Sequence, residues 1–243
     1  MSSDQITLYD LPSKPPCAAW SLNPWKTRIP QHQARIGAPV RPQLASYGLL
    51  LTTHDNSVSA NPSTGTWTIP TVKFPDGAYI MDSLQIVQRI EKEHPEPSVH
   101  LDSPALAKLG DIMPRLMGPL RPIYFTNVPE QLLNQESIAY WHETRSKLAG
   151  MPLDKFSEEQ GGQKAWDAAK PALHEVEALI RENPDGPFFL GKTPSYADFQ
   201  WAGLLIFLQR NGVIEELYKI SGDSHLHKDL LEATAPWAKR NDH

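Results

Sequence analysis

Two short segments of the sequence place polar side chains where a helix is expected to begin. In the first, Ser21 and Asn23 precede Pro24, which suits the first position of a helix, so we predict that Asn23 caps this helix. In the second, Asp82 and Ser83 open an apolar, helix-like run. The free N–H groups and the dipole of a helix N-terminus favour an anion. A hydroxyl there can donate to a thiolate or an oxyanion, and a carboxylate can accept from an ammonium group.

Both segments also fit purely structural roles. An Asp-Ser pair at a helix start is more often a cap than a ligand site, and the Ser21 hydroxyl can simply satisfy a backbone group. Cys17 is the rival nucleophile, because a thiol at a helix N-terminus has a lowered pKa. It lies in the preceding loop, several residues before Pro24, so Ser21 is the preferred candidate, with Asn23 as a second donor.

A third segment, TIPTVKFPDGAYIMDS (68–83), predicts a β-hairpin, since two apolar runs flank a Pro-Asp-Gly turn. Pro70 falls inside the first expected strand, where proline gives up a ladder hydrogen bond. We predict a cis bond between Ile69 and Pro70, which would leave the Ile69 N–H and C=O free to pair with an extended, peptide-like ligand. The alternative is a trans proline on an unused edge strand.

The elements that must position these residues fall into two halves. The run QITLYDL (5–11) predicts a strand, a helix follows from Pro24, and the segment after Asp82 predicts a second helix. A segment rich in Pro and Ser (95–104) indicates a linker. Beyond it the spacing is helical throughout, with kinks expected at Pro114 and Pro171.

Composition limits the class of protein. The chain has 243 residues, of which 40% are hydrophobic and 21% charged, as in ordinary globular proteins. A net charge of −5 gives no electrostatic support for a nucleic-acid partner. No apolar run approaches the roughly 20 residues of a membrane span, and the N-terminus is unlike a signal peptide. A single cysteine excludes a disulfide framework within one chain and a cysteine-based zinc site, and it suits a reducing cytosolic setting.

Taken together, these segments resemble the cytosolic glutathione transferases. The hairpin TIPTVKFPDGAYIMDS is similar to that family's glutathione-binding segment, and FFLGKTPSYADF (188–199) resembles its helical folding motif. In the second motif, Ser195 and Asp198 form an S-x-x-D box that caps a buried helix, so Asp198 is expected to be structural. The spacing Ser-x-x-x-Trp-basic-Thr-basic from Ser21 to Arg28, with the ending APWAKRND, resembles the fungal etherase-like class, which is related to bacterial lignin β-etherases.

The resemblance implies a fold and domain boundaries. It implies an α/β, thioredoxin-like, glutathione-binding domain over 1–94 and an all-α domain over 104–243, together the glutathione transferase fold. It also implies a cytoplasmic homodimer with no membrane or nucleic-acid partner.

The resemblance further implies a chemistry. Ser21 and Asn23 would be catalytic, and Ile69, Pro70, Asp82 and Ser83 would bind glutathione, the co-substrate, with no metal. The bound thiolate would then be conjugated to aromatic electrophiles or would cleave aryl ethers, in a detoxification role.

Other functions remain open. The same fold could serve as an aromatic-ligand carrier or as a non-enzymatic regulator. Tyr124, Phe125 and Trp201 could line an apolar substrate site, although core positions are the preferred interpretation.

Residues 28–62 depart from the family pattern, through divergence, an alternative exon or a reading-frame slip. Pro30 is expected to end the first helix, and Pro39 and Pro42 to block a regular element.

Overall fold

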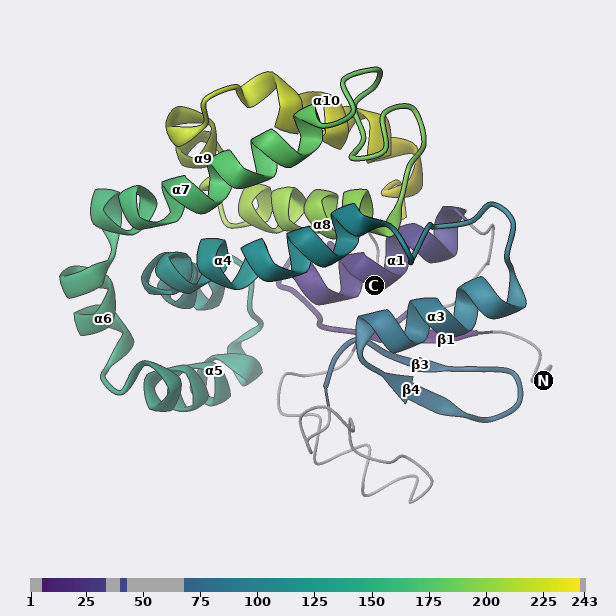
Figure 1. Cartoon of the computed structure of the whole chain (residues 1–243). Coiled ribbons are helices and arrows are strands. Elements are labelled where there is room, and N and C mark those ends of the chain that lie inside the picture. Colours follow the sequence, from purple (N-terminus) through teal and green to yellow (C-terminus); the bar gives the residue numbers. More distant parts are fainter. Residues whose placement is uncertain (1–5, 34–39, 43–67, 241–243) are drawn as a thin grey trace. The chain divides into compact units, whose positions relative to one another are not determined.

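The computed structural model describes residues 6–33, 40–42 and 68–240, and it divides the chain into two compact units. The N-terminal unit comprises the chain up to Val99 together with the segment from Pro236 onward, and the helical unit comprises His100–Ala235 (Figure 1). A small sheet with helices followed by a helical domain is the architecture predicted from the sequence.

The N-terminal unit is built on a four-stranded sheet in the order β2-β1-β3-β4. Its strands are β1 (Thr7–Asp10), β2 (Val40–Pro42), β3 (Thr71–Lys73) and β4 (Tyr79–Met81). β1 pairs in parallel with β2 and antiparallel with β3, and β3 pairs antiparallel with β4. The expectation that Pro42 blocks a regular element is wrong, because Pro42 ends a strand at the sheet edge, where proline is tolerated. Pro39 lies outside the described residues.

The predicted hairpin is present, with one difference in detail. Its turn closes through a hydrogen bond from Gly77 N to Phe74 O of 3.0 Å, and Gly77 adopts the positive φ of 87° that favours glycine. The Ile69–Pro70 peptide bond is cis, as predicted. Pro70 precedes β3 instead of lying inside it, so the proline takes no hydrogen bond from the ladder.

Helix α1 (Leu22–Gln33) corrects two sequence expectations. It begins before Asn23, and the Ser21 carbonyl accepts from Trp25 N at 3.4 Å, so Asn23 is an exposed first-turn residue and not the cap. Pro24 fits the first turn, where backbone N–H groups have no partner within the helix. The helix also continues through Pro30. Burial of Trp25 and Ile29, which are 1% and 0% exposed, stabilises the turns that precede Pro30 and offsets the backbone hydrogen bond lost there.

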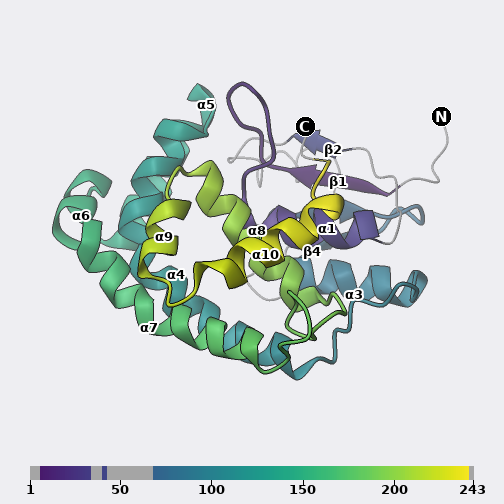
Figure 2. The ribbon, with the colours of Figure 1, turned by 90° about the horizontal axis from the view of Figure 1, so that it is seen from above.

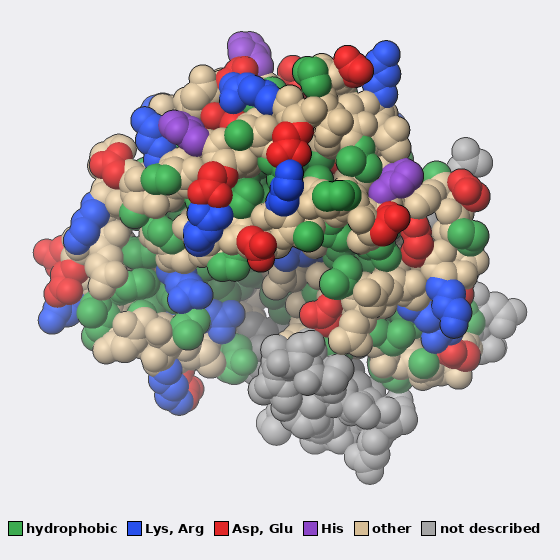
Figure 3. Space-filling model, in the orientation of Figure 1, with side chains coloured by type: hydrophobic (Ala, Val, Ile, Leu, Met, Phe, Trp, Pro, Cys, Tyr) green, Lys and Arg blue, Asp and Glu red, His purple; other side chains and the backbone are tan. Residues whose placement is uncertain are grey.

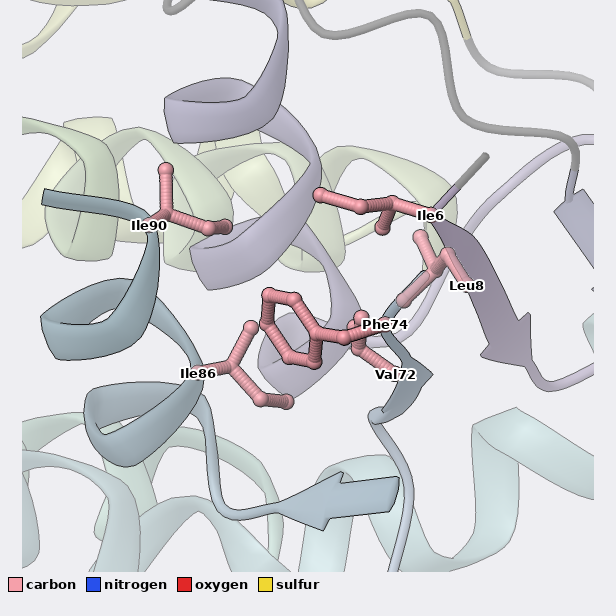
Figure 4. Close-up of a cluster of buried hydrophobic side chains, with 6 residues drawn as sticks. All are labelled: Ile6, Leu8, Val72, Phe74, Ile86 and Ile90. Atoms are coloured by element: carbon pink, nitrogen blue, oxygen red, sulfur yellow. The ribbon is translucent and has the colours of Figure 1, made fainter. Parts of the chain in front are cut away.

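Helix α3 (Ser83–Glu93) packs its apolar face on the sheet. Ile86 and Ile90 meet Phe74 and two strand residues in a cluster that also contains Ile6 (Figure 4). All six side chains are at most 5% exposed, which fixes the start of α3 relative to the strands.

The helical unit follows from α4, with no strand among its described elements apart from isolated bridges at 188–193. Its helices are α4 (Pro104–Gln131), α5 (Gln135–Ala149), α6 (Leu153–Gln160), α7 (Gly162–Arg181), α8 (Tyr196–Arg210), α9 (Ile214–Ile220) and α10 (Ser224–Thr234), followed by a 3-10 turn (Ala235–Trp237). Helix α8 is buried along most of its length and packs against α4, α9 and α10 (Figures 1 and 2). Helices α4 and α7 run on through Pro114 and Pro171.

The capping box of α8 confirms the structural role predicted for Asp198. One carboxylate oxygen accepts from Ser195 N and Ser195 Oγ at 2.7 and 2.6 Å, and the other accepts from Phe189 N at 2.8 Å. The side chain is fully buried, and burial raises the pKa of Asp198 to about 6 against the effect of these hydrogen bonds. Asp198 therefore joins the 188–193 loop to the start of α8 and faces no solvent.

The surface of the helical unit carries interspersed charges over α4 and α7 (Figure 3). Arg115 on α4 pairs with Glu175 on α7, and Lys108 on α4 pairs with Glu182, which directly follows α7. All four side chains are about half exposed, so these pairs contribute little to stability.

Candidate functional site

The strand register brings three of the predicted segments to one end of the sheet. Tyr9 pairs with Thr71, and Thr71 pairs with Met81, so the end of β1, the Ile69–Pro70 bond and Asp82 are neighbours. The loop after β1 folds back on itself, since Trp20 Nε1 donates to Pro12 O at 3.3 Å. This contact returns the chain to the end of β1 just before Ser21. The N-termini of α1 and α3 therefore start from the same end of the sheet.

Ser21 presents an uncommitted hydroxyl at the start of α1. The side chain is partly buried, and within the described residues its Oγ makes no hydrogen bond. A serine at this position normally accepts from a backbone N–H of the first turn. Its hydroxyl is therefore available to donate to a ligand.

Asp82 is held by its own helix. Its Oδ1 accepts from Leu84 N at 2.9 Å and Gln85 N at 3.3 Å, so Asp82 is the cap of α3, as predicted for Asp82 or Ser83. Within the described residues, Oδ2 accepts no hydrogen bond. The backbone φ of Asp82 is 74°, a conformation that costs a residue other than glycine about 1–3 kcal/mol and that clusters at ligand sites. Asp82 can therefore cap α3 through Oδ1 and still contact a ligand through Oδ2.

Lys26 is a candidate site residue that sequence reasoning missed. It lies one turn into α1 and is partly buried, near enough to Asp82 for the two charges to interact. Burial lowers the pKa of Lys26, and the negative charge of Asp82 acts in the opposite direction. Yet no ion pair within 4.0 Å joins the two among the described residues. Only its place in a basic motif marked Lys26 in the sequence, and the nearness to Asp82 depends on how α1 packs against α3.

The other basic residue of this motif has a structural role. Arg28 Nε lies 2.6 Å from Asp10 Oδ2, with side-chain exposures of 4% and 0%, and its Nη1 donates to Arg240 O at 3.2 Å. Trp25, which lies beneath the Arg28 guanidinium at 5.7 Å, is also buried. Arg28 therefore anchors the end of β1 and the returning chain end, and it is not available to a ligand.

Backbone groups complete the cluster. Among the described residues, the Ile69 N–H and C=O take part in no strand pairing or other backbone hydrogen bond. The N–H of Ser83, which opens α3, is likewise uncommitted, because Asp82 takes the next two. Cys17 is exposed in the loop, as expected, where its own N–H donates to Lys14 O at 3.0 Å. The arrangement thus offers a strand-like edge, a carboxylate oxygen, an ammonium group and a hydroxyl.

The aromatic residues considered in the helical unit are divided between core and surface. Phe125 and Trp201 are core, at 3% and 0% exposed, while Tyr124 is only partly buried. In the described ranges, no group of three His, Cys, Asp or Glu side chains could hold a metal ion. None of the described helices is both long and apolar enough to cross a membrane.

Three comparisons with known proteins all point to glutathione transferases. Residues 110–236 match the family model described as "Glutathione S-transferase, C-terminal domain". The chain is 27% identical over 162 residues to the glutathione S-transferase-like protein ustS of Aspergillus flavus. This match covers 63% of the chain and 54% of ustS, so the chain spans about half the length of that relative.

Solved structures share the fold over nearly the whole chain. A glutathione S-transferase of Ceriporiopsis subvermispora, crystallised in complex with glutathione, is 23% identical, with a TM-score of 0.81, covering 96% of this chain and 98% of that one. Glutathione transferase GSTFuA2 of Phanerochaete chrysosporium is 20% identical, with a TM-score of 0.80, covering 98% and 100%. At these identities the likeness concerns the fold.

Proposed function

This chain belongs to the glutathione S-transferase family, and we propose that it binds glutathione in its N-terminal unit and conjugates it to aromatic electrophiles through a thiolate stabilised by Ser21. The observation that carries the proposal is the meeting of Ser21, Ile69 and Asp82 at one end of the sheet. The glutathione bound to a structural relative from Ceriporiopsis supports it.

Each part of the tripeptide has a partner of matching chemistry. The Ile69 N–H and C=O pair with the cysteinyl backbone, as an added strand would, with Pro70 shaping the chain there. Asp82 Oδ2 accepts from the ammonium group of the γ-glutamyl end. The carboxylate of the same end accepts from the Ser83 N–H and hydroxyl, and it lies against the Lys26 ammonium. The zwitterionic γ-glutamyl end thus binds between the Asp82 carboxylate and the Lys26 ammonium. Among the described residues these two groups do not form an ion pair with each other.

Ser21 then shifts the ionisation of the thiol. A thiol of pKa about 8.5 is mostly protonated at neutral pH, and lowering this pKa by about two units requires roughly 2.7 kcal/mol in favour of the thiolate. A hydrogen bond from the Ser21 hydroxyl to the charged sulfur contributes about 1.5–3 kcal/mol. The N-terminus of α1 adds a smaller favourable term. Asn23, exposed in the first turn, is the candidate second donor.

The reaction is a substitution at carbon. The thiol proton leaves to solvent, and the thiolate forms a C–S bond as the bond from carbon to the leaving group breaks. With an aryl ether the leaving group is a phenolate, which takes up a proton from water. We assign the chain to the etherase-like class on the Ser21-to-Arg28 motif, and we expect it to act as a cytoplasmic homodimer in detoxification.

A single assay series distinguishes this function from its alternatives. The full chain is tested for capture on immobilised glutathione, for conjugation of 1-chloro-2,4-dinitrobenzene, and for release of a fluorescent phenol from a β-aryl ether. Capture with either turnover supports the transferase, and phenol release supports the etherase-like class. Binding of aromatic compounds without capture or turnover would identify a carrier. Absence of aromatic binding as well as of capture and turnover would favour a regulator.

A further inference from the structure

A buried ion pair joins the end of β1 to the second turn of α1. Arg28 Nε lies 2.6 Å from Asp10 Oδ2, and the two side chains are 4% and 0% exposed. The other oxygen, Asp10 Oδ1, accepts from Leu11 N at 2.6 Å. One carboxylate therefore holds both the first residue of the loop that leaves the sheet and the helix that follows this loop. Ser21 lies between these two attachment points in the chain.

Among the described residues, Arg28 is the buried polar side chain of α1 that has a partner in the sheet. Three other polar atoms of α1 are buried and have no hydrogen-bond partner in the same part of the chain: Trp25 Nε1, Thr27 Oγ1 and Gln31 Nε2. Ile29 and the Trp25 ring add apolar burial, which has no directional preference. The contact of Arg28 with β1 therefore limits how far α1 can slide or rotate relative to the sheet.

The loop that carries Ser21 is closed by its own hydrogen bonds. Trp20 Nε1 donates to Pro12 O at 3.3 Å. Ser13 Oγ donates to Ala18 O at 3.1 Å. Trp20 is 2% exposed and directly precedes Ser21. Because the loop is fixed on one side of Ser21 and α1 on the other, Ser21 has little freedom to move relative to β1.

The chemistry proposed for Ser21 depends on its exact position. A hydrogen bond weakens steeply outside its usual range of length and angle, so a displacement of about 1 Å removes most of its effect. The proposed glutathione partners Ile69 and Asp82 flank β3 and β4, and the pairing of these strands fixes them relative to β1. The position of Ser21 relative to these partners is therefore set through β1 and its link to α1.

We infer that Asp10 and Arg28 are positioning residues for the Ser21 hydroxyl, and that their buried pair holds this hydroxyl at the sulfur of bound glutathione. The inference rests on the proposed function and deepens it, because it names the residues that set the geometry of the thiolate contact. Both side chains are buried, so they act without touching the ligand. The pair carries no net charge, so its effect on the sulfur comes from geometry and not from a long-range field.

The variant Asp10→Asn/Arg28→Met tests the inference, because it removes both charges together and leaves no unpaired buried ion. Its asparagine oxygen can still accept from Leu11 N. The thiol pKa of bound glutathione is measured from the ultraviolet absorbance of the thiolate. We expect this pKa, which the proposed function sets about two units below the free value, to rise by about one unit or more. Glutathione affinity should stay within about threefold, because its partners next to β3 and β4 are unchanged.

Two further variants separate positioning from stability. Arg28→Lys keeps a cation opposite Asp10, and it should hold the thiol pKa within about half a unit of the parent. Ile90→Ala removes a buried side chain from α3, two turns beyond Asp82. It should lower the melting temperature of the N-terminal unit and leave the thiol pKa unchanged.

The most direct comparison repeats the double variant in a Ser21→Ala background. Because the hydroxyl that the pair positions is then absent, removing the pair should move the thiol pKa by less than about 0.3 unit. An equal rise in both backgrounds would show that the pair does not act through Ser21, and it would overturn the inference.

The other contrary outcomes are equally distinct. An unchanged thiol pKa in Asp10→Asn/Arg28→Met, or an equal rise in Ile90→Ala, would overturn the inference and leave the proposed function standing. Loss of glutathione binding in the double variant would make the pair a requirement of folding and would also overturn the inference. A parent whose bound thiol keeps the pKa of free glutathione would refute the proposed function, and the inference with it.

Discussion

The carboxylate of Asp82 can serve both as the cap of α3 and as a ligand contact. Oδ1 caps α3 through Leu84 N and Gln85 N, while Oδ2 has no hydrogen-bond donor among the described residues. The strained φ of 74° places the side chain at the helix start next to Ile69–Pro70. An asparagine can keep the cap with its amide oxygen but cannot supply a negative charge to an ammonium group.

Asp82→Asn should therefore fold normally and bind glutathione much more weakly. Loss of the charged partner is expected to cost about 1.5–3 kcal/mol, or roughly ten- to a hundredfold in affinity. Calorimetric titration of the variant against the parent measures it. Unchanged affinity together with a lower melting temperature would leave Asp82 as a cap only.

Lys26→Met should weaken glutathione binding without lowering the stability of the fold. The ammonium is partly buried, and with no carboxylate within 4.0 Å among the described residues its removal breaks no ion pair, so the melting temperature should not fall. Glutathione affinity should drop about tenfold through loss of a carboxylate partner. Lys92→Met, an exposed residue in the last turn of α3, is the control. Equal affinity in Lys26→Met and the parent would remove Lys26 from the site.

At the level of elements, local signals predicted the structure wherever the deciding contacts were close in sequence. The hairpin followed from its turn and apolar runs, α3 from Asp82 and its apolar spacing, and the α8 box from Ser195 and Asp198. The continuation of helix α1 past Pro30 did not follow, because burial of Trp25 and Ile29 outweighs the cost of the proline.

Some residues of the candidate site could likewise be predicted from local sequence signals, and others depend on packing. Ser21, Asp82 and Ser83 could be proposed from helix starts alone, and the Ile69–Pro70 bond from the hairpin. Lys26 could not, because its environment is created by the packing of α1 on α3.

Glu177 on α7 gives an element-level prediction on pH. Its Oε1 accepts from Ser221 Oγ at 2.6 Å and Gly222 N at 2.9 Å, and lies 3.4 Å from His227 Nε2. Burial works to raise its pKa, but the hydrogen bonds from His227, Ser221 and Gly222 prevail and hold the pKa at about 2. Because the folded state lowers this pKa, the stabilisation is present above about pH 4.5 and is lost as the pH falls toward 2.

In Glu177→Gln, the free energy of unfolding should therefore fall less steeply as the pH is lowered from about 4.5 to 2. Over that window the parent should lose about 3 kcal/mol more stability than the variant, as measured by urea unfolding at stepped pH. Glu158→Gln, an exposed change on α6, should keep the parent profile. A variant whose acid loss equals that of the parent would show that Glu177 does not tie α7 to the segment around Ser221.

At the scale of the whole chain, the last described residues return to the first strand. The segment from Pro236 belongs to the N-terminal unit, and Arg240 O accepts from Arg28, whose Nε holds the buried Asp10. Without this acceptor the buried Arg28 guanidinium loses one of its hydrogen bonds. The chain end therefore supports the ion pair beneath the candidate site.

A chain ending at Lys239 should lose about 1–3 kcal/mol of stability in the N-terminal unit. A chain ending at Arg240 is the matched control, because its terminal carboxylate still accepts from Arg28. Thermal unfolding followed by the fluorescence of the tryptophans compares the two. Equal melting temperatures would show that the Arg28–Arg240 contact carries no stability.

The proposed function depends most directly on the ionisation of bound glutathione. Ultraviolet absorbance of the thiolate is titrated against pH in the complexes of glutathione with the parent, Ser21→Ala and Cys17→Ser. The parent and Cys17→Ser should show an apparent thiol pKa about two units below that of free glutathione, and Ser21→Ala should return it toward the free value with modest loss of affinity. An unchanged thiol pKa in Ser21→Ala, or loss of the shift in Cys17→Ser, would contradict a serine-stabilised thiolate.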